Sequence, residues 1–297
     1  MLLLLSTLTR ATPLILTGLA VAIAFRAGVL NIGADGQFLA GATGAVVVGA
    51  LGRGWAPLAQ SAVGIPLALT AGALLGAGWA GIAAWMRERF NVPAVISTLM
   101  LNFIALDGVG YLVRGPLQEP SHIYPQTQEL SGAWHLATLV PGSRIHVGLL
   151  LGVVACGVAA WMLASTAKGF RLRAVGSNPH AAASAGQIDV AAVAATALVV
   201  SGALAGLAGA IEVTGVTFAL YENISPGYGY TAIAVALLAG LEPLLVIPSG
   251  IFFGALEATA AALQRDVGLP AVAASAVEAV IILVALTVSR RTAVLSA

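Results

Sequence analysis

Residues 190–212 decide the fold class, since they read VAAVAATALVVSGALAGLAGAIE and carry no charged side chain before Glu212. A helix of this length and apolarity is long enough to cross a bilayer, whose hydrocarbon core takes ~20 apolar residues. The whole chain has this character: 59% of its 297 residues are hydrophobic, 8% are charged, and the mean hydropathy is +0.98. Soluble domains carry about 25% charged residues. The sequence therefore predicts an integral membrane protein.

Similar apolar runs recur along the chain and predict an all-α, polytopic transmembrane helix bundle. The length allows roughly eight to ten membrane segments and leaves no room for a soluble domain, so we expect residues 1–297 to form one transmembrane domain. Three of the runs are short, and either their flanks extend them or they are broken or re-entrant helices. The expected segments are residues 11–25, 38–51, 58–86, 92–113, 146–164, 190–212, 228–241, 244–263 and 271–289.

The charged and reactive residues exclude several classes of function. Thirteen Lys and Arg against twelve Asp and Glu leave a net charge of +1, without the basic face that nucleic-acid binding needs. The single cysteine, Cys156, cannot form an intrachain disulfide. The four histidines lack metal-ligand spacing, and no phosphate-binding glycine loop with its lysine occurs. We therefore expect a chain that is not an enzyme and binds no metal, nucleotide or nucleic acid.

The positions of Lys and Arg predict the orientation, because cytoplasmic loops carry the excess of these residues. If the loop 165–189 is cytoplasmic, alternate crossings place the C-terminus inside and the polar connection 114–145 outside. That connection is either a lid or partner-binding segment, or a solvated loop with interfacial aromatics. The inside group is Arg26, Arg87, Arg89, Lys168, Arg171, Arg173, Arg290 and Arg291, and the outside group is Arg10, Arg53, Arg114, Arg144 and Arg265.

Within that cytoplasmic loop, residues 168–186 read KGFRLRAVGSNPHAAASAG and predict a short capped helix. Asn178 is a favourable N-cap, Pro179 suits the first helical position, and Gly186 suits the position after the last turn. Two turns from Pro179 to Ala185 are too short to be stable alone in water. The small Ala and Ser side chains fit a shallow groove of another protein, although a capped surface helix without a partner has the same sequence.

A polar break separates two apolar runs at residues 26–37, RAGVLNIGADGQ. Irregular backbone at membrane depth requires protein or a water-filled cavity around it. Asn31, Asp35 and Gln37 therefore either line a cavity or tie the break together by hydrogen bonds.

Polar side chains also occur inside other expected segments. Thr98 and Asn102 lie four residues apart, so we expect this face of their helix to look into the bundle, toward either a solute or another helix. Tyr228 and Tyr230 open another short segment with rings that either contact a ligand or sit at the membrane interface.

Several carboxylates fall in or at the ends of expected helices without a Lys or Arg alongside in the sequence: Asp107, Glu212, Glu257 and Glu278. Such groups are either proton-relay groups or protonated, hydrogen-bonded structural groups. Small residues four apart favour close helix contacts or reflect the Ala- and Gly-rich composition. The pairs are Gly72 and Gly76, Gly148 and Gly152, Gly202 and Gly206, and Gly250 and Gly254.

Five motifs in this order resemble the permease subunits of ABC importers for nucleosides and simple sugars, a branch of the branched-chain amino acid and ribose permease superfamily. The likeness runs from about Thr12 to Val288. Members of this branch often have an additional first helix and a longer N-terminal tail, and Asp35 stands where Glu is more usual. The motifs are GVLNIGADGQ at 28–37, STLMLNFI at 97–104, VGSNPHAAASAGQI at 175–188, SGALAGLAGA at 201–210 and GYGYTAIAVALL at 227–238.

The resemblance implies a permease subunit that pairs with a second permease, or with a copy of itself, around one pathway in the cytoplasmic membrane of a prokaryote. A separate ATPase would bind ATP and Mg²⁺, and an extracytoplasmic binding protein would deliver the solute. The coupling helix would include Gly176, Asn178, Pro179, Ala182 and Gly186. The pathway residues expected here are Asn31, Asp35, Gln37, Thr98, Asn102, Tyr228 and Tyr230.

The alternative function is a proton-coupled secondary transporter that uses Glu257 or Glu278 and works without any ATPase. The sequence leaves the solute open, as it does the choice between a homodimer and a heterodimer of permeases. Few polar residues reach the expected pathway, which suits a conduit whose selectivity lies in a separate receptor.

Overall fold

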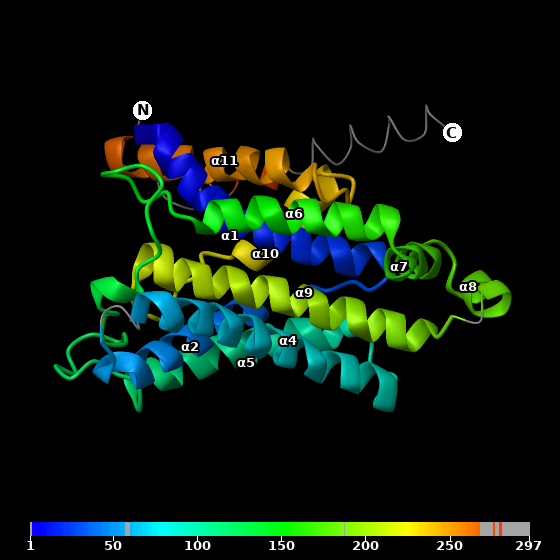
Figure 1. Cartoon of the computed structure of the whole chain (residues 1–297), viewed down its shortest axis with the longest axis horizontal. Helices are drawn as coiled ribbons and strands as arrows, with labels where there is room; N and C mark the ends of the chain where they lie inside the picture. The colour runs from blue at the N-terminus through cyan, green and yellow to red at the C-terminus, as the bar shows by residue number, and fades with distance from the viewer. Residues whose placement is uncertain (1, 57–59, 187, 268–275, 277–278, 281–297) are drawn as a thin grey trace.

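The computed structural model describes residues 2–56, 60–186, 188–267, 276, 279 and 280. In this part of the chain long helices run roughly parallel or antiparallel along one axis (Figure 1). Their order is α1 (Leu2–Arg26), α2 (Ala34–Leu51), α4 (Ile65–Phe90), α5 (Ala94–Arg114), α6 (Gly148–Ser165), α7 (Ala167–Ser177), α8 (Pro179–Gly186), α9 (Val190–Glu212), α10 (Tyr228–Leu238) and α11 (Val246–Val267). Short helical turns add η1 (Gly52–Gly54), η2 (Gln60–Gly64), η3 (Gly132–Trp134) and η4 (Val213–Thr217).

Seven helices among the described residues are long and apolar enough to cross a membrane, which confirms an all-α polytopic bundle. Flanking residues lengthen two of the three short runs, since α1 has 25 residues and α2 has 18. The third, α10, has only 11 residues, so it is a partial crossing. The expected segment 271–289 lies almost wholly outside the described residues.

Small residues form the closest contacts between helices. The backbones of α4 and α9 meet at Gly72, Gly76 and Gly206, where a Cβ on any of the three would clash with the facing backbone or side chains. Gly41 of α2 packs against the backbone of Gly206 from another side. The glycine pairs 72/76 and 202/206 therefore mark a real helix seam, as does 250/254, where α11 packs on α1.

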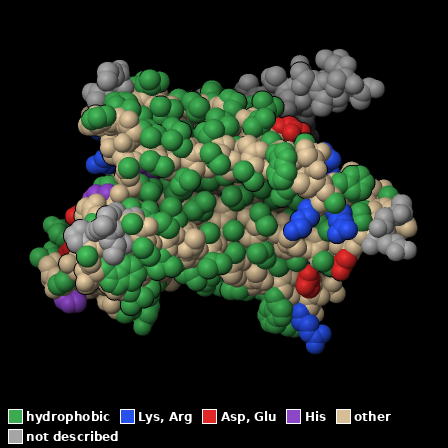
Figure 2. All heavy atoms as spheres, viewed as in Figure 1, with side chains coloured by type: hydrophobic (Ala, Val, Ile, Leu, Met, Phe, Trp, Pro, Cys, Tyr) green, Lys and Arg blue, Asp and Glu red, His purple; other side chains and the backbone are tan. Residues whose placement is uncertain are grey.

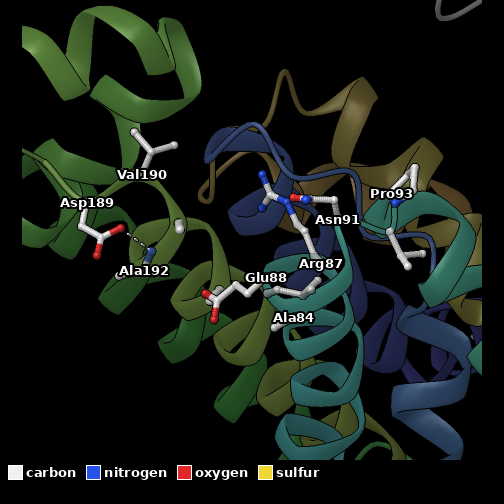
Figure 3. Close-up of a pocket in the computed structure, with 12 residues that line it drawn as sticks. Ala84, Arg87, Glu88, Asn91, Pro93, Asp189, Val190 and Ala192 are labelled. Atoms are coloured by element: carbon white, nitrogen blue, oxygen red, sulfur yellow. Dashed lines mark hydrogen bonds between the residues drawn. The ribbon is translucent and has the colours of Figure 1, made fainter.

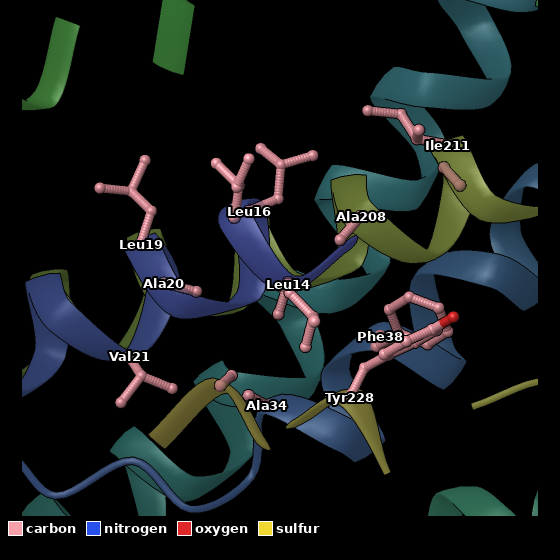
Figure 4. Packing of buried hydrophobic residues seen from close by; sticks show 14 of the residues in the cluster. Leu14, Leu16, Leu19, Ala20, Val21, Ala34, Phe38, Ala208, Ile211 and Tyr228 are labelled. Carbon is pink, nitrogen blue, oxygen red and sulfur yellow. The ribbon is translucent and has the colours of Figure 1, made fainter. Parts of the chain in front are cut away.

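The hydrophobic core lies where α1, α2, α9 and α10 meet (Figure 4). Leu14 and Leu16 of α1 are fully buried, as is Ile211 of α9. The rings of Phe38 and Tyr228 join α2 to α10, with centroids 5.7 Å apart. This core fixes α2 and α10, the two helices that begin with a polar break, against each other.

The two ends of the bundle carry most of the charged side chains visible in Figure 2, and hydrophobic side chains dominate between them. At one end α7 and α8 lie beyond the other helices (Figure 1), and Gly176 of α7 packs on the backbone of Arg26. The ends of α4 and α9 meet there too, since Arg87 and Asp189 line one cavity. Basic residues expected inside therefore gather at the α8 end, while Arg290 and Arg291 lie outside the described residues.

Candidate functional site

A hydrogen-bonded cluster closes the polar break between α1 and α2. Asn31 is fully buried, and its Nδ2 donates to Gln37 Oε1 at 2.9 Å and to Ser201 Oγ of α9 at 2.8 Å. Its Oδ1 accepts from the backbone N–H of Gly33 at 2.9 Å and from Gln37 Nε2 at 3.1 Å. The side-chain amide of Asn31 thus forms hydrogen bonds to both Gly33 and Gln37, and its bond to Ser201 attaches the break to α9. Of the two expectations for this stretch, the structure shows the hydrogen-bonded tie.

Two side chains of α5 complete this cluster from the other side. Asn102 Oδ1 accepts from the N–H of Gly36 at 2.8 Å, and its Nδ2 donates to the carbonyl of Ile32 at 2.9 Å. Thr98 Oγ1 accepts from the N–H of Ile32 at 3.2 Å. Both side chains are buried, so this face of α5 looks into the bundle as expected and bonds the break rather than open space.

Asp35, in the first turn of α2, binds the start of α10. Its Oδ1 accepts from Ser225 Oγ at 2.6 Å and from the N–H of Gly229 at 3.0 Å. Free N–H groups at a helix N-terminus favour a negative partner. Gly229 is required here, because a Cβ would clash with the backbone of Asp35. We call Asn31, Asp35, Gln37, Thr98 and Asn102 together the polar knot.

The two tyrosines of α10 lie in different surroundings. Tyr228 is buried against Phe38, whereas 42% of Tyr230 is exposed. The Tyr230 hydroxyl accepts a hydrogen bond from Asn102 Nδ2 at 3.2 Å. Tyr230 is thus the surface residue that the polar knot holds in place. Membership of the seven residues in a translocation pathway stays a prediction.

The capped helix predicted at the α8 end is confirmed. Asn178 Oδ1 accepts from the N–H of Ala181 at 3.0 Å, and α8 begins at Pro179. Its exposed side chains include His180, Ala181, Ala183 and Ser184, while Ala182 is buried against its own chain. The exposed face of α8, which we call its free face, is therefore formed by these residues on either side of Ala182. Ala182 itself is not part of it. A docking role for this helix stays a prediction.

Beside α8 lies a cavity of about 720 Å³ between the end of α4 and the start of α9 (Figure 3). Arg87, Glu88 and Asn91 line one side, and Asp189 lies on the other. The Asp189 Oδ1 accepts from the N–H of Ala192 at 3.0 Å and so caps α9. This hollow adds charged groups of both signs to the end of the molecule that carries α8.

The connection 114–145 is folded onto the opposite end of the bundle. The N–H of Thr127 donates to the carbonyl of Leu220 at 2.9 Å, and the N–H of Leu130 donates to that of Phe218 at 2.8 Å. Hydrogen bonds from Ser121 and Gln126 hold the pKa of Glu119 below its ordinary value. The connection 114–145 is therefore an ordered segment that covers this end of the bundle, and we call it the cap. Its role in binding a partner stays a prediction.

The carboxylates of the sequence prediction lie in separate places. Glu257 has no Lys or Arg near it in the sequence, but it pairs across the bundle with Arg10 of α1 at 3.7 Å. Glu212 is buried and lines a cavity of about 740 Å³ together with Arg10, Arg144 and Tyr228. Asp107 is exposed on α5, and Glu278 lies outside the described residues. Among the described residues no group of His, Cys, Asp and Glu could hold a metal ion.

Fold and site together define a multi-pass helical membrane protein with broken segments, ordered by buried hydrogen bonds, and a protruding capped helix at one end. Residues 3–286 match the family model described as the branched-chain amino acid transport system permease component. The chain belongs to this permease family, and it is a transport subunit rather than an enzyme.

Relatives match over most of the chain. The glucose ABC transporter permease protein of Haloferax volcanii is 36% identical over 94% of this chain and 75% of its own length. The guanosine ABC transporter permease protein of Bacillus subtilis is 37% identical over 93% of this chain and 79% of its own. The nucleoside ABC transporter permease protein of Lactococcus lactis is 31% identical over 93% of this chain and 77% of its own length. No solved structure matches the chain significantly. Nothing found supports the proton-coupled alternative.

Proposed function

We propose that this chain is the transmembrane subunit of an ATP-driven ABC importer and moves a nucleoside-like or simple-sugar-like solute across the cytoplasmic membrane of a prokaryote. The match of residues 3–286 to the permease family carries this proposal. Relatives named for glucose, guanosine and nucleosides support the solute class. The positive-inside distribution supports a cytoplasmic position for the α8 end and for the C-terminus.

In this proposal α8 is the contact with a separate ATPase, which binds ATP and Mg²⁺ while this chain binds neither. Support comes from the free face of α8, whose short side chains leave room for a partner surface. A two-turn helix gains stability from such packing. Gly176 supports the same function, because α7 sits directly on the end of α1 and links α8 to the bundle.

The same proposal includes a second permease subunit, which is a copy of this chain or a paralogue, and an extracytoplasmic binding protein that delivers the solute to the 114–145 cap. Of the seven residues expected on the pathway, Tyr230 presents the most exposed side chain, and we place it on the pathway wall. The polar knot and Tyr228 stand behind Tyr230 and hold α2, α5 and α10 in register.

The experiment is reconstitution of the chain with candidate ATPase and binding-protein subunits of the same organism, followed by uptake of guanosine and of glucose. We expect uptake of one of them that requires ATP. Uptake that survives ATP depletion but collapses with the proton gradient would contradict the proposal and favour the secondary transporter.

A substitution then tests the coupling contact. Ala183→Glu places a bulky charge on the exposed face of α8, and we expect it to abolish solute-stimulated ATP hydrolysis while membrane insertion persists. The matched control is Ala56→Glu, an exposed alanine at the opposite end of the bundle and outside the 114–145 cap, which leaves ATPase binding unchanged. Unchanged coupling in Ala183→Glu would exclude α8 as the ATPase contact.

A further inference from the structure

We propose that the outer half of α5 and the segment before α10 form one wall of a water-filled groove, that the solute passes along this groove, and that a second permease subunit closes it. This inference rests on the proposed function and adds the solute-contacting surface. The groove has a volume of about 530 Å³ and is lined by Asp107, Tyr111, Arg114, Glu222 and Asn223, among others.

Asp107 indicates that this surface does not face lipid. It is exposed on a membrane-spanning helix, seven residues before Arg114 and so ~10 Å along the axis from that end. No hydrogen bond or ion pair connects it to another of the described residues, whereas Arg114 is paired with Glu222. A charged side chain facing hydrocarbon is costly, so such residues face a bundle interior or a water-filled cavity. Within this subunit the groove that Asp107 lines is open on one side, so a second subunit has to supply the other wall.

The exposed face of α6 shows what a lipid-facing surface looks like in the same molecule. All its exposed side chains before Ser165 are apolar: Leu150, Val153, Val154, Val158, Trp161 and Ala164. Both helices cross the membrane, yet only α5 of this pair carries an exposed carboxylate within the span. An exposed face without charge, as on α6, is typical of a helix that faces lipid. The exposed carboxylate on α5 indicates a face toward water and protein.

Inward of the groove lies Tyr230, whose hydroxyl is bonded to Asn102, five residues before Asp107 on α5. On the part of α5 that precedes Asp107 the exposed side chains are apolar: Ile96, Met100, Phe103, Ile104 and Leu106. Polar surface thus occupies the outer half and gives way to an apolar stretch nearer the α8 end.

The lining suits a neutral, hydroxyl-rich ring. The free Asp107 carboxylate accepts hydrogen bonds from hydroxyl groups, and the Arg114–Glu222 pair leaves little net charge beside it. The ring face of Tyr111, which lines the groove, can stack on a sugar or a base. A nucleoside or a monosaccharide presents both kinds of surface.

Cysteine accessibility in the complete transporter tests the wall. Asp107→Cys and Tyr111→Cys are the test variants, Val154→Cys and Val158→Cys on α6 are matched controls, and the wild type with its buried Cys156 is the blank. A membrane-impermeant methanethiosulfonate is applied outside right-side-out vesicles. We expect both test variants to react, their uptake to stop, and the transported solute to slow the reaction, while the controls stay unmodified.

Two outcomes would overturn the inference. One is test cysteines that stay as unreactive as Val154→Cys, which would place this face against lipid or dry protein. The other is test cysteines that react without slowing by the solute and without loss of uptake. If the wild-type complex takes up neither guanosine nor glucose, the proposed function fails instead, and the two failures are therefore distinct.

A conservative variant sharpens the role of the carboxylate. We expect Asp107→Asn to raise the KM of uptake about tenfold, the factor for one lost charge-assisted hydrogen bond, with the amount of assembled complex unchanged. Val154→Asn is the control for a polar group placed on an exposed helix face. An unchanged KM in Asp107→Asn would remove this carboxylate from solute contact.

Discussion

The polar knot and the groove both place polar side chains at membrane depth on α5, but they differ in what satisfies those groups. Asn102 is buried and bonds three groups of its own chain, at Gly36, Ile32 and Tyr230. Asp107, just over one turn further along, is exposed and bonds none of the described residues. Polarity within a span therefore does not by itself identify a pathway. The pairing of each group separates structural hydrogen bonding from a surface that awaits water, solute or a partner.

The largest effect we expect is the loss of the helix seam on which the polar knot depends. Gly206→Leu would force the α9 backbone away from Gly72 and Gly76, where no space exists for a Cβ. Because these atoms are backbone and cannot shift cheaply, we expect loss of folded protein rather than a modest destabilisation. Size-exclusion chromatography in detergent measures this loss. The control is Gly157→Leu on α6, where nothing lies within 4 Å of an added Cβ. Equal yields of both variants would contradict the seam.

Asn31→Ala tests the buried half of the comparison directly. We expect it to lower the free energy of unfolding by about 2 to 3 kcal/mol, because Gln37, Ser201 and the Gly33 N–H all lose a buried partner. Denaturant titration in detergent is the measurement. Asp107→Ala is the matching variant in the groove. We expect it to lower the free energy of unfolding by less than about 0.5 kcal/mol, as for other surface substitutions. Similar losses for the two variants would erase the distinction between knot and groove.

Asp35 allows a smaller, graded test within the knot. Asp35→Ala removes the acceptor for Ser225 and for the Gly229 N–H, and we expect a loss of about 1 to 2 kcal/mol. Asp35→Asn keeps one acceptor oxygen in place and should retain more than half of that stability. Thermal unfolding monitored by circular dichroism ranks the two variants. If Asn is as harmful as Ala to stability, the hydrogen-bond account of Asp35 is incorrect.

The smallest effect concerns acid sensitivity at the α8 end, away from both regions. A hydrogen bond from Arg26 lowers the pKa of Glu242, so the pair stabilises the fold above the ordinary glutamate value of 4.5. That contribution is lost as the pH falls through the lowered pKa. We expect it to be less than about 1 kcal/mol, because the Glu242 side chain is half exposed and screened by solvent. Unfolding of Arg26→Gln should therefore depend less on pH below 4.5 than that of the wild type. An identical acid profile would show that the ion pair contributes nothing.

Features that depend on adjacent residues could be predicted from the sequence, whereas pairs of residues far apart in the chain could not. The N-cap at Asn178 and the apolar length of α9 depend on adjacent residues, so both were predicted. The Asn31 bond to Ser201 spans 170 positions, and the Arg10 pair with Glu257 joins α1 to α11. No local pattern indicates such partners. The groove was missed for a similar reason, since periodicity shows that a helix has faces but not which face lacks a neighbour.

The short helix α10 is fastened at both of its ends to the α1–α2 segment. Its first turn receives Asp35, and just beyond its last turn Arg26 donates to the carbonyl of Leu241 at 3.2 Å and pairs with Glu242. A tilt or slide of this 11-residue helix against α1 and α2 would break the contacts at one or both of its ends. We therefore expect α1, α2 and α10 to move as one unit, so that any alternation between open and closed states would arise where this unit meets the other elements.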